Sequence, residues 1–241
     1  MEKIVVANLK MNMTAACVND YLNNIKDVIN TKKVVICPPA LYLPYFVRKK
    51  YSVGAQDCFY VDEGAYTGCI SANQIASMGI KYTIIGHSER RQYFHETDNI
   101  VNKKVINALE NNLNVILCIG ETKEERDMLK TDKILKRQLI NCLRGIDEKN
   151  IENVIIAYEP IWSIGTGLIP TIKEITSTTA YILQILNSLY PEKDIKVLYG
   201  GSVNEKNIES INSVENINGV LVGGASLDAN KLAKIKEVVL G

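Results

Sequence analysis

Two ionisable side chains in this sequence follow short apolar runs, where a charged group needs a partner or a function. Glu159 follows the run Val-Ile-Ile-Ala-Tyr and precedes Pro160, and His87 follows Ile-Ile-Gly. Apolar neighbours raise the pKa of a carboxyl group toward the range that suits a general base. A helix that begins at His87 would keep the imidazole neutral, as a hydrogen-bond donor. The pair predicts acid–base chemistry; the alternatives are a strand-end salt bridge for Glu159 and a simple helix cap for His87.

Lys10 is the basic residue that we expect to point into the same site. It ends the first apolar run of the chain, two residues after Asn8, and Glu89 offers it an acidic partner. A solvated lysine at a strand end is the alternative. His95, the other histidine of the sequence, has no such position and is predicted to be structural or exposed.

Two glycine pairs follow the last two apolar runs of the chain. They are Gly200-Gly201, followed by Ser202, and Gly223-Gly224. Glycine lets a backbone approach a ligand closely and present its N–H groups to it. A phosphate site after the seventh and eighth strands is a recurrent feature of β/α barrels. Either pair alone would be an ordinary turn, but the two together predict a phosphate site.

The segment that directly follows Glu159 has the composition of a lid. It begins with proline, contains glycine near its end and is apolar in the middle, as suits a loop that closes over a site and reopens. The alternative is a partly buried loop that Trp162, the sole tryptophan, anchors. The predicted lid comprises Pro160, Ile161, Trp162, Ser163, Ile164, Gly165, Thr166 and Gly167.

Short apolar, β-branched runs recur along the whole chain and predict eight strands. Most are continuously apolar, as in parallel strands that are covered on both faces. Eight strand–helix units in 241 residues fit a single closed (β/α)8 barrel domain over residues 1–241. An open doubly wound sheet is the rival, but Ala7-Asn8-Leu9-Lys10 does not resemble its usual G-x-G-x-x-G turn. The predicted strands are Ile4–Lys10, Val34–Pro38, Ser52–Gln56, Tyr82–Gly86, Val115–Gly120, Val154–Glu159, Ile195–Gly200 and Gly219–Gly223.

Between these runs, apolar residues at helical spacing predict amphipathic helices. The clearest N-terminal signals are Thr97-Asp98 and the pair Thr122 and Glu125, which has the spacing of a capping box. The predicted helical faces are Tyr21, Ile25, Val28 and Ile29, then Ile100, Val101, Val105 and Leu109, and the segments Lys133–Leu143 and Ile175–Leu189.

Bulk composition limits the partners that this chain can have. The 28 basic and 27 acidic residues give a net charge of +1, which creates no long-range field for nucleic acid or an anionic membrane. Six cysteines without a CxxC pair predict free thiols in a reducing compartment rather than disulfides or zinc. The N-terminus turns polar too quickly for a signal peptide, and no apolar run approaches the ~18–20 residues of a membrane span. We therefore expect a cytoplasmic protein without nucleic-acid or membrane partners.

Seven segments of the chain carry a pattern more specific than any single residue. They are Asn8–Asn12 (NLKMN), Gly54–Gln56 (GAQ), Gly86–Arg91 (GHSERR), Ala157–Trp162 (AYEPIW), Gly165–Gly167 (GTG), Tyr199–Val203 (YGGSV) and Gly219–Leu227 (GVLVGGASL). In this order they resemble triosephosphate isomerases, and the resemblance extends from Met1 to Gly241.

The resemblance implies a TIM barrel that interconverts dihydroxyacetone phosphate and D-glyceraldehyde 3-phosphate through an enediolate, in glycolysis and gluconeogenesis. It implies neither a metal nor an organic cofactor. Glu159 would take the proton beside the carbonyl group. His87 would polarise that carbonyl and carry protons between the two oxygens. Lys10 would stabilise the enediolate and, with Asn8, bind the substrate.

Supporting roles follow from the same resemblance. Glu89 would pair with Lys10, and Ser88 and Cys118 would lie around the catalytic groups, the cysteine as packing support near the base. The residues implied in phosphate binding are Gly165, Ser202, Gly223 and Gly224.

A homodimer is also implied by the resemblance. Thr67 matches a threonine that the family inserts near the partner's active site, in the loop after the third strand. Cys69 stands where the family usually has a glutamate that pairs with an arginine across the dimer. We therefore expect this ion pair to be missing and the dimer to be modestly weaker.

Two other functions compete with this interpretation. A different phosphosugar barrel, such as a tryptophan- or histidine-pathway isomerase or a pentulose-phosphate epimerase, would share the phosphate site. It would lack the set formed by His87, Glu159 and the segment 160–167. A non-catalytic binding or scaffold protein is the second alternative, because a fold alone does not establish a function. The complete set of polar residues argues against it.

Overall fold

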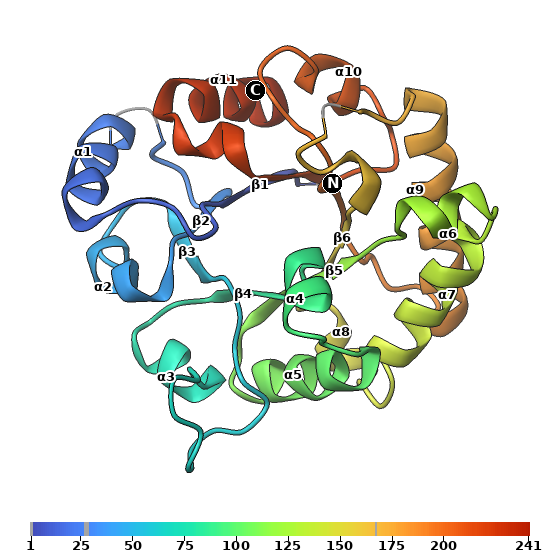
Figure 1. Ribbon diagram of the computed structural model, residues 1–241, viewed down its shortest axis with the longest axis horizontal. Coiled ribbons are helices and arrows are strands. Elements are labelled where there is room, and N and C mark those ends of the chain that lie inside the picture. Colours follow the sequence, from blue (N-terminus) through green and yellow to red (C-terminus); the bar gives the residue numbers. More distant parts are fainter. Residues whose placement is uncertain (1, 27–28, 167) are drawn as a thin grey trace.

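Eight parallel strands close into one barrel in the computed structural model, which describes residues 2–26, 29–166 and 168–241 (Figure 1). The strands are β1 (Ile4–Asn8), β2 (Val34–Cys37), β3 (Ser52–Ala55), β4 (Tyr82–Ile85), β5 (Asn114–Ile119), β6 (Val154–Tyr158), β7 (Val197–Tyr199) and β8 (Gly219–Val222). Each strand pairs with the next along the chain, and β8 closes the ring against β1, with Gly219 opposite Ile4. The predicted (β/α)8 fold class is confirmed.

Several strands end one or two residues before their predicted ends. β1 ends at Asn8 rather than Lys10, and β6 ends at Tyr158 rather than Glu159. Lys10 has a φ of 51°, a left-handed conformation that no strand can continue through. Lys10, His87 and Glu159 therefore lie just after the strands, whereas Asn8 is the last residue of β1.

Helices surround the barrel, as Figure 1 shows. The α-helices are α1 (Ala15–Ile25), α2 (Leu43–Phe46), α3 (Ala72–Ser77), α4 (Ser88–Tyr93), α5 (Asp98–Glu110), α6 (Lys123–Asp127), α7 (Thr131–Cys142), α8 (Glu148–Ile151), α9 (Ile172–Leu189), α10 (Ile208–Asn212) and α11 (Ala229–Leu240). The 3-10 helices of the described ranges are η1 (Ala40–Tyr42), η2 (Ile161–Ser163) and η3 (Gly224–Leu227).

The predicted helices are present. α7 covers the predicted segment except for Leu143, which is its C-cap, and α9 contains all of Ile175–Leu189. Tyr21 and Ile25 are buried on α1, whereas Val28 lies outside the described residues. Tertiary packing of these apolar faces, more than intrinsic propensity, stabilises helices of this length.

The two predicted N-terminal caps are also confirmed. The Thr97 side chain accepts a hydrogen bond from the backbone N–H of Ile100, at the start of α5. Thr122 and Glu125 form a reciprocal capping box at the start of α6. These bonds satisfy N–H groups that have no partner within the helix.

Both faces of the sheet are buried. Along β1, Val6 points into the barrel, while Val5 and Ala7 pack in the layer between the strands and the helices. This explains why the strands are continuously apolar rather than alternating. The barrel interior is filled by Ile4, Val6, Val35, Cys37, Ile84, Ile116, Cys118, Ile155, Ala157, Leu198 and Leu221.

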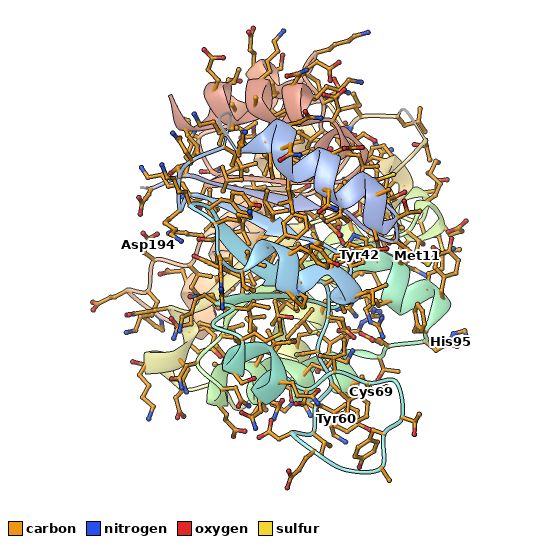
Figure 2. All side chains as sticks on the ribbon, turned by 90° about the vertical axis from the view of Figure 1, so that its left-hand side faces the viewer. Met11, Tyr42, Tyr60, Cys69, His95 and Asp194 are labelled. Atoms are coloured by element: carbon orange, nitrogen blue, oxygen red, sulfur yellow. The ribbon has the colours of Figure 1, made fainter. Side chains whose placement is uncertain are left out.

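The loop between β3 and α3, residues 56–71, projects away from the barrel (Figure 1). Phe59 packs within it against Tyr60 and Tyr66, with ring centroids 4.3 Å and 4.7 Å apart. Thr67 and Cys69 lie exposed on the same loop. In Figure 2, Tyr60 and Cys69 mark this projection.

All six cysteines, each within the described residues, are free thiols, as predicted. Cys17 and Cys69 are exposed and the other four are buried. Within the described helices, none combines the length and the apolar character that crossing a bilayer requires.

Candidate active site

One cavity of about 680 Å³ opens at the end of the barrel where the strands terminate. Residues that follow β1, β4, β6, β7 and β8 meet there, although they are far apart in the sequence. In parallel barrels this end of the sheet is where catalytic side chains converge. The cavity is lined by every residue predicted to be catalytic or substrate-binding: Asn8, Lys10, His87, Glu159, Gly165, Ser202, Gly223 and Gly224.

Glu159 and His87 lie face to face in this cavity. Oε1 of Glu159 is 3.1 Å from Nε2 of His87, and Oε2 accepts a hydrogen bond of 3.2 Å from the backbone N–H of Ser88. Both side chains are buried. His87 is the N-cap of α4, and its Nδ1 accepts a hydrogen bond from the N–H of Glu89. Because Nδ1 is an acceptor, the proton of the neutral imidazole is on Nε2, directed at Glu159.

Two glycines make room for Glu159. A Cβ at Gly120, after β5, would lie 1.7 Å from the backbone oxygen of Glu159. A Cβ at Gly200, after β7, would lie 2.9 Å from Cγ of the same residue. Gly200, part of the predicted phosphate site, lines the cavity and also lies beside the Glu159 side chain. At Gly224 an added Cβ would meet no described atom within 4 Å, so this glycine does face open space.

Cys118 lies at the end of the barrel interior next to Glu159. Burial, and then the neighbouring Glu159 carboxylate, raise the pKa of this thiol well above its usual range. A thiol in such a setting stays protonated and is a poor nucleophile. Its position agrees with packing support for Glu159 rather than with covalent chemistry.

Lys10 reaches the cavity from the loop after β1. Its Nζ is 2.7 Å from Oε1 of Glu89, and Oε2 of Glu89 lies 3.6 Å from Nδ1 of His87. A Cβ at Gly223 would be 3.3 Å from Cε of Lys10, so the lysine side chain passes close over that glycine. Glu89 thus pairs with the ammonium group of Lys10 through its side chain and contacts the imidazole of His87 through its backbone N–H.

The glycines after β7 and β8 give the cavity the features of an anion site. Gly224 begins η3, and the first N–H groups of a helical turn have no partner within that turn. Ser202 lies beside it in the cavity, and its hydroxyl donates a hydrogen bond to the backbone oxygen of Ser163 in the predicted lid. At this place the cavity can therefore offer backbone N–H groups as hydrogen-bond donors to a dianion, rather than a buried ion pair.

The predicted lid begins with η2, which is firmly held. The indole Nε1 of Trp162 donates a hydrogen bond of 2.8 Å to Oε1 of Glu121, and the Arg126 guanidinium stacks 3.8 Å from the ring centroid. Trp162 is therefore buried and anchors the loop, which was the sequence-based alternative to a lid. Ile164 and Gly165 line the cavity, which also suits a lid. Gly167, its predicted last residue, lies outside the described residues.

Comparison with known proteins decides the family. The model of the triosephosphate isomerase family matches residues 3–239. The chain belongs to the triosephosphate isomerase family. It is 41% identical to the triosephosphate isomerases of Alkaliphilus oremlandii, over 96% of this chain and 97% of that protein, and of Malacoplasma penetrans, over 99% of both chains. The triosephosphate isomerase of Thermodesulfovibrio yellowstonii is also 41% identical, over 97% of this chain and 98% of that protein. As a family member, the chain is an isomerase of triose phosphates.

Sequence reasoning missed several residues around the site of this triosephosphate isomerase family member. Asn12, Lys206 and Lys231 also line the cavity. Asn12 could have been found, because it belongs to the same segment as Asn8 and Lys10. The two lysines follow β7 and β8 at a distance, and no sequence signal marks them. Among the described residues, no three His, Cys, Asp or Glu side chains are grouped as metal ligands.

A buried ionic cluster fixes α4, the helix that carries Glu89. Lys104, 2% exposed, places Nζ 2.7 Å from both carboxylate oxygens of Asp57 and 2.6 Å from Oε1 of Glu96. Arg90 of α4 lies 2.9 Å from the same Asp57 and 2.6 Å from the same Glu96. The cluster therefore ties α4 and α5 to the base of the loop after β3.

Asp57 predicts a pH dependence of stability. Burial raises the pKa of its carboxyl from 3.8 to about 6, although Lys104 opposes the shift. Between these values the folded protein holds a proton that the unfolded chain has released. The contribution of Asp57 to the free energy of unfolding therefore rises as the pH falls from about 6 to about 4, by at most about 1.4 kcal/mol per pH unit.

In Asp57→Asn this contribution should vanish. Urea unfolding at fixed protomer concentration, repeated between about pH 4 and pH 6, measures it as a difference in slope between the two proteins. The wild type should gain more stability, or lose less, on acidification than Asp57→Asn. Identical slopes would contradict the assignment.

Proposed function

We propose that this chain interconverts dihydroxyacetone phosphate and D-glyceraldehyde 3-phosphate through an enediolate, with Glu159 as the base and His87 as the electrophile. The observation that carries this proposal is the 3.1 Å approach of Glu159 Oε1 to His87 Nε2, in a cavity that also holds Lys10. A base and a hydrogen-bond donor that face the same small volume can act on adjacent atoms of one substrate.

The mechanism needs only proton transfers. The carboxylate of Glu159 takes a proton from the carbon beside the carbonyl group. The Nε2–H group of His87 donates a hydrogen bond to the carbonyl oxygen, and later carries a proton between the two oxygens. Glu159 then returns its proton to the neighbouring carbon. In the free protein the Glu159 carboxylate accepts hydrogen bonds from His87 and Ser88. The incoming substrate therefore has to displace the carboxylate from these hydrogen bonds.

The enediolate formed between the two transfers carries negative charge that Lys10 would stabilise. An ammonium group fixed in advance at the site of developing charge is effective because it need not reorganise during the reaction. Asn8 would hold the substrate beside it. Gly165, Ser202, Gly223 and Gly224, which line the same cavity, would bind the phosphate.

Closure of the segment 160–167 would exclude water from the enediolate. Ile164 and Gly165 line the cavity, and Trp162 is fixed to Glu121 at the start of the segment. A lid that is anchored at one end can move its other residues over the substrate while the position of Glu159 stays unchanged. Exclusion of water strengthens each electrostatic contact inside the site.

A homodimer that acts in the cytoplasm, in glycolysis and gluconeogenesis, is part of the proposal. Free thiols suit a reducing compartment. Exposed large apolar side chains support the dimer, among them Met11, which is 96% exposed, and Phe94, which lines a cavity together with Thr67 and Cys69 of the projecting loop. Figure 2 shows Met11, Tyr42 and Cys69 on one side of the molecule, opposite Asp194. Exposed apolar patches of this kind mark protein–protein contacts.

Cys69→Glu is expected to strengthen this dimer. A glutamate at the exposed position 69 would restore the ion pair that the resemblance implies, and a partly exposed pair contributes ~0–1 kcal/mol. The dissociation constant should fall by up to about fivefold, and less at high salt. Sedimentation of Cys69→Glu beside Cys69→Gln, which adds similar bulk without charge, measures this. An unchanged dissociation constant would count against a charged partner for position 69.

A coupled assay for the isomerisation of glyceraldehyde 3-phosphate tests the proposed reaction, with Glu159→Asp alongside. Rapid turnover that Glu159→Asp reduces severely is the expected result. Turnover of a larger phosphosugar in place of the triose would favour a different phosphosugar isomerase. Binding of glycerol 3-phosphate without any turnover of the triose would favour a binding protein.

A further inference from the structure

The backbone of Lys10 is held in a conformation that lysine rarely adopts. Its φ of 51° lies in the left-handed region, which costs free energy for any residue with a Cβ. Such a conformation persists only where the surrounding structure enforces it. The neighbourhood of Lys10 should therefore contain groups that do so.

Three amide side chains surround this piece of backbone. Oδ1 of Asn8 accepts a hydrogen bond of 3.0 Å from the N–H of Lys10. Nε2 of Gln56 donates a bond of 2.9 Å to the carbonyl oxygen of Lys10. Nδ2 of Asn12 donates a bond of 2.7 Å to the carbonyl oxygen of Leu9. The peptide groups on both sides of the Lys10 Cα are thus each held by a side chain.

Gln56 also ties this loop to the barrel. Its Nε2 donates a second bond, of 2.8 Å, to the carbonyl oxygen of Cys37 at the end of β2. The same Cys37 oxygen accepts the N–H of Leu9. Because both acceptors of Gln56 are carbonyl oxygens, its amide nitrogen must face them, and the orientation of the amide is settled. Gln56, which directly follows β3, thus links the backbone of Lys10 to the end of β2 and restrains it.

The left-handed conformation decides where the ammonium group lies. It sends the Lys10 side chain close over Gly223 to a position 2.7 Å from Glu89. An extended or right-handed φ would turn the Cα–Cβ bond away from this path. We propose that Asn8, Asn12 and Gln56 form an amide clamp that positions the ammonium of Lys10 for the reaction. The proposal rests on the role given above to Lys10, and Gln56 in it is a positioning residue.

Gln56→Met tests the clamp, because methionine keeps the length of the side chain and removes the donor. A displacement of a catalytic group by about 1 Å costs about 10²-fold in rate, so kcat/KM should fall by about 10- to 100-fold. In a Lys10→Met background the same substitution should change kcat/KM by less than about twofold, since there is no ammonium left to misplace. A merely structural role would lower activity equally in both backgrounds.

Asn102→Leu is the matched control. Nδ2 of Asn102 also donates to two backbone oxygens, those of Cys142 and Arg144, each at 2.9 Å. Its substitution should lower the free energy of unfolding and leave kcat/KM unchanged. Assays at several protomer concentrations separate an effect on assembly, because Gln56 lies at the base of the loop proposed for the dimer. Should Gln56→Met fail to fold, Asn12→Ala takes its place in the same cycle.

Strong coupling between positions 56 and 10 is the expected result. Equal losses in the two backgrounds, wild-type activity in Gln56→Met, or a loss that disappears at high protomer concentration would each overturn the clamp. Unchanged activity in Lys10→Met alone would contradict the role proposed for Lys10, and the clamp with it. Failure of the proposal and failure of the proposed mechanism thus give different results.

Discussion

Glu159→Gln is expected to lower kcat for triose phosphate isomerisation by about 10²- to 10⁴-fold, the range that one positioned base contributes. Glutamine has the same shape and can still contact the backbone N–H of Ser88, but it cannot take a proton from carbon. The carboxylate is buried and lies 3.1 Å from Nε2 of His87, the group proposed to polarise the substrate carbonyl. Steady-state kinetics in both directions of the reaction measure the loss.

Two further measurements make this result specific to the base. Binding of glycerol 3-phosphate, which has the phosphate but no carbonyl group, should change little in Glu159→Gln. Glu152→Gln, at an exposed carboxylate that pairs with Lys193, should keep wild-type kcat. A Glu159→Gln protein with more than about a tenth of the wild-type kcat would show that the proton goes elsewhere.

His87→Gln is expected to show the second large loss, again of about 10²- to 10⁴-fold in kcat. An amide can donate a hydrogen bond to the substrate carbonyl, but it does not carry a proton from one oxygen to the other. In the structure the cap of α4 makes Nδ1 of His87 an acceptor from Glu89, which leaves its proton on Nε2. The neutral ring can thus donate its Nε2 proton to one substrate oxygen and take a proton back from the other.

The two losses should not add in the double variant. Groups that act as a unit on one substrate show strong non-additivity, because either substitution already disables the shared step. Glu159→Gln with His87→Gln should be little worse than the poorer single variant. Multiplicative losses in the double variant would indicate that the residues act in separate steps.

The placement of Glu159 and His87 could be predicted from the sequence, since each follows an apolar run and the barrel brings all strand ends to one rim. The pattern could not show where each strand ends. Lys10 leaves β1 through a left-handed turn that three amide side chains hold, and these lie at positions 8, 12 and 56. Such a turn depends on tertiary contacts, which an apolar run does not encode.

The glycines show the same limit. Gly120 is required because β5 and β6 pair in a register that brings the Glu159 carbonyl to 1.7 Å from its added Cβ. The sequence around Gly200 predicts a phosphate contact, and it could not show that Gly200 also makes room for the Glu159 side chain. The sequence shows that these positions need glycine for a close approach. Only the closed barrel shows which atom makes that approach.

Contacts between distant loops were beyond sequence reasoning altogether. Trp162 finds its partners, Glu121 and Arg126, in the loop and helix after β5. Lys231 reaches the cavity only because β8 closes against β1 and brings α11 beside the loop of Lys10. Neither contact leaves a spacing or a composition that could be read along the chain.

Conversion of dihydroxyacetone phosphate in D₂O, followed by proton NMR, tests most directly whether a carboxylate transfers the proton through an enediolate. A proton held on Glu159 can exchange with solvent before it returns, so deuterium should appear on the carbon that becomes C2 of glyceraldehyde 3-phosphate. Glu159→Gln should lower turnover by about 10²- to 10⁴-fold, and with it the rate at which deuterium enters the product. Full-rate turnover by Glu159→Gln, giving product without any deuterium on that carbon, would indicate direct hydride transfer and would contradict the mechanism.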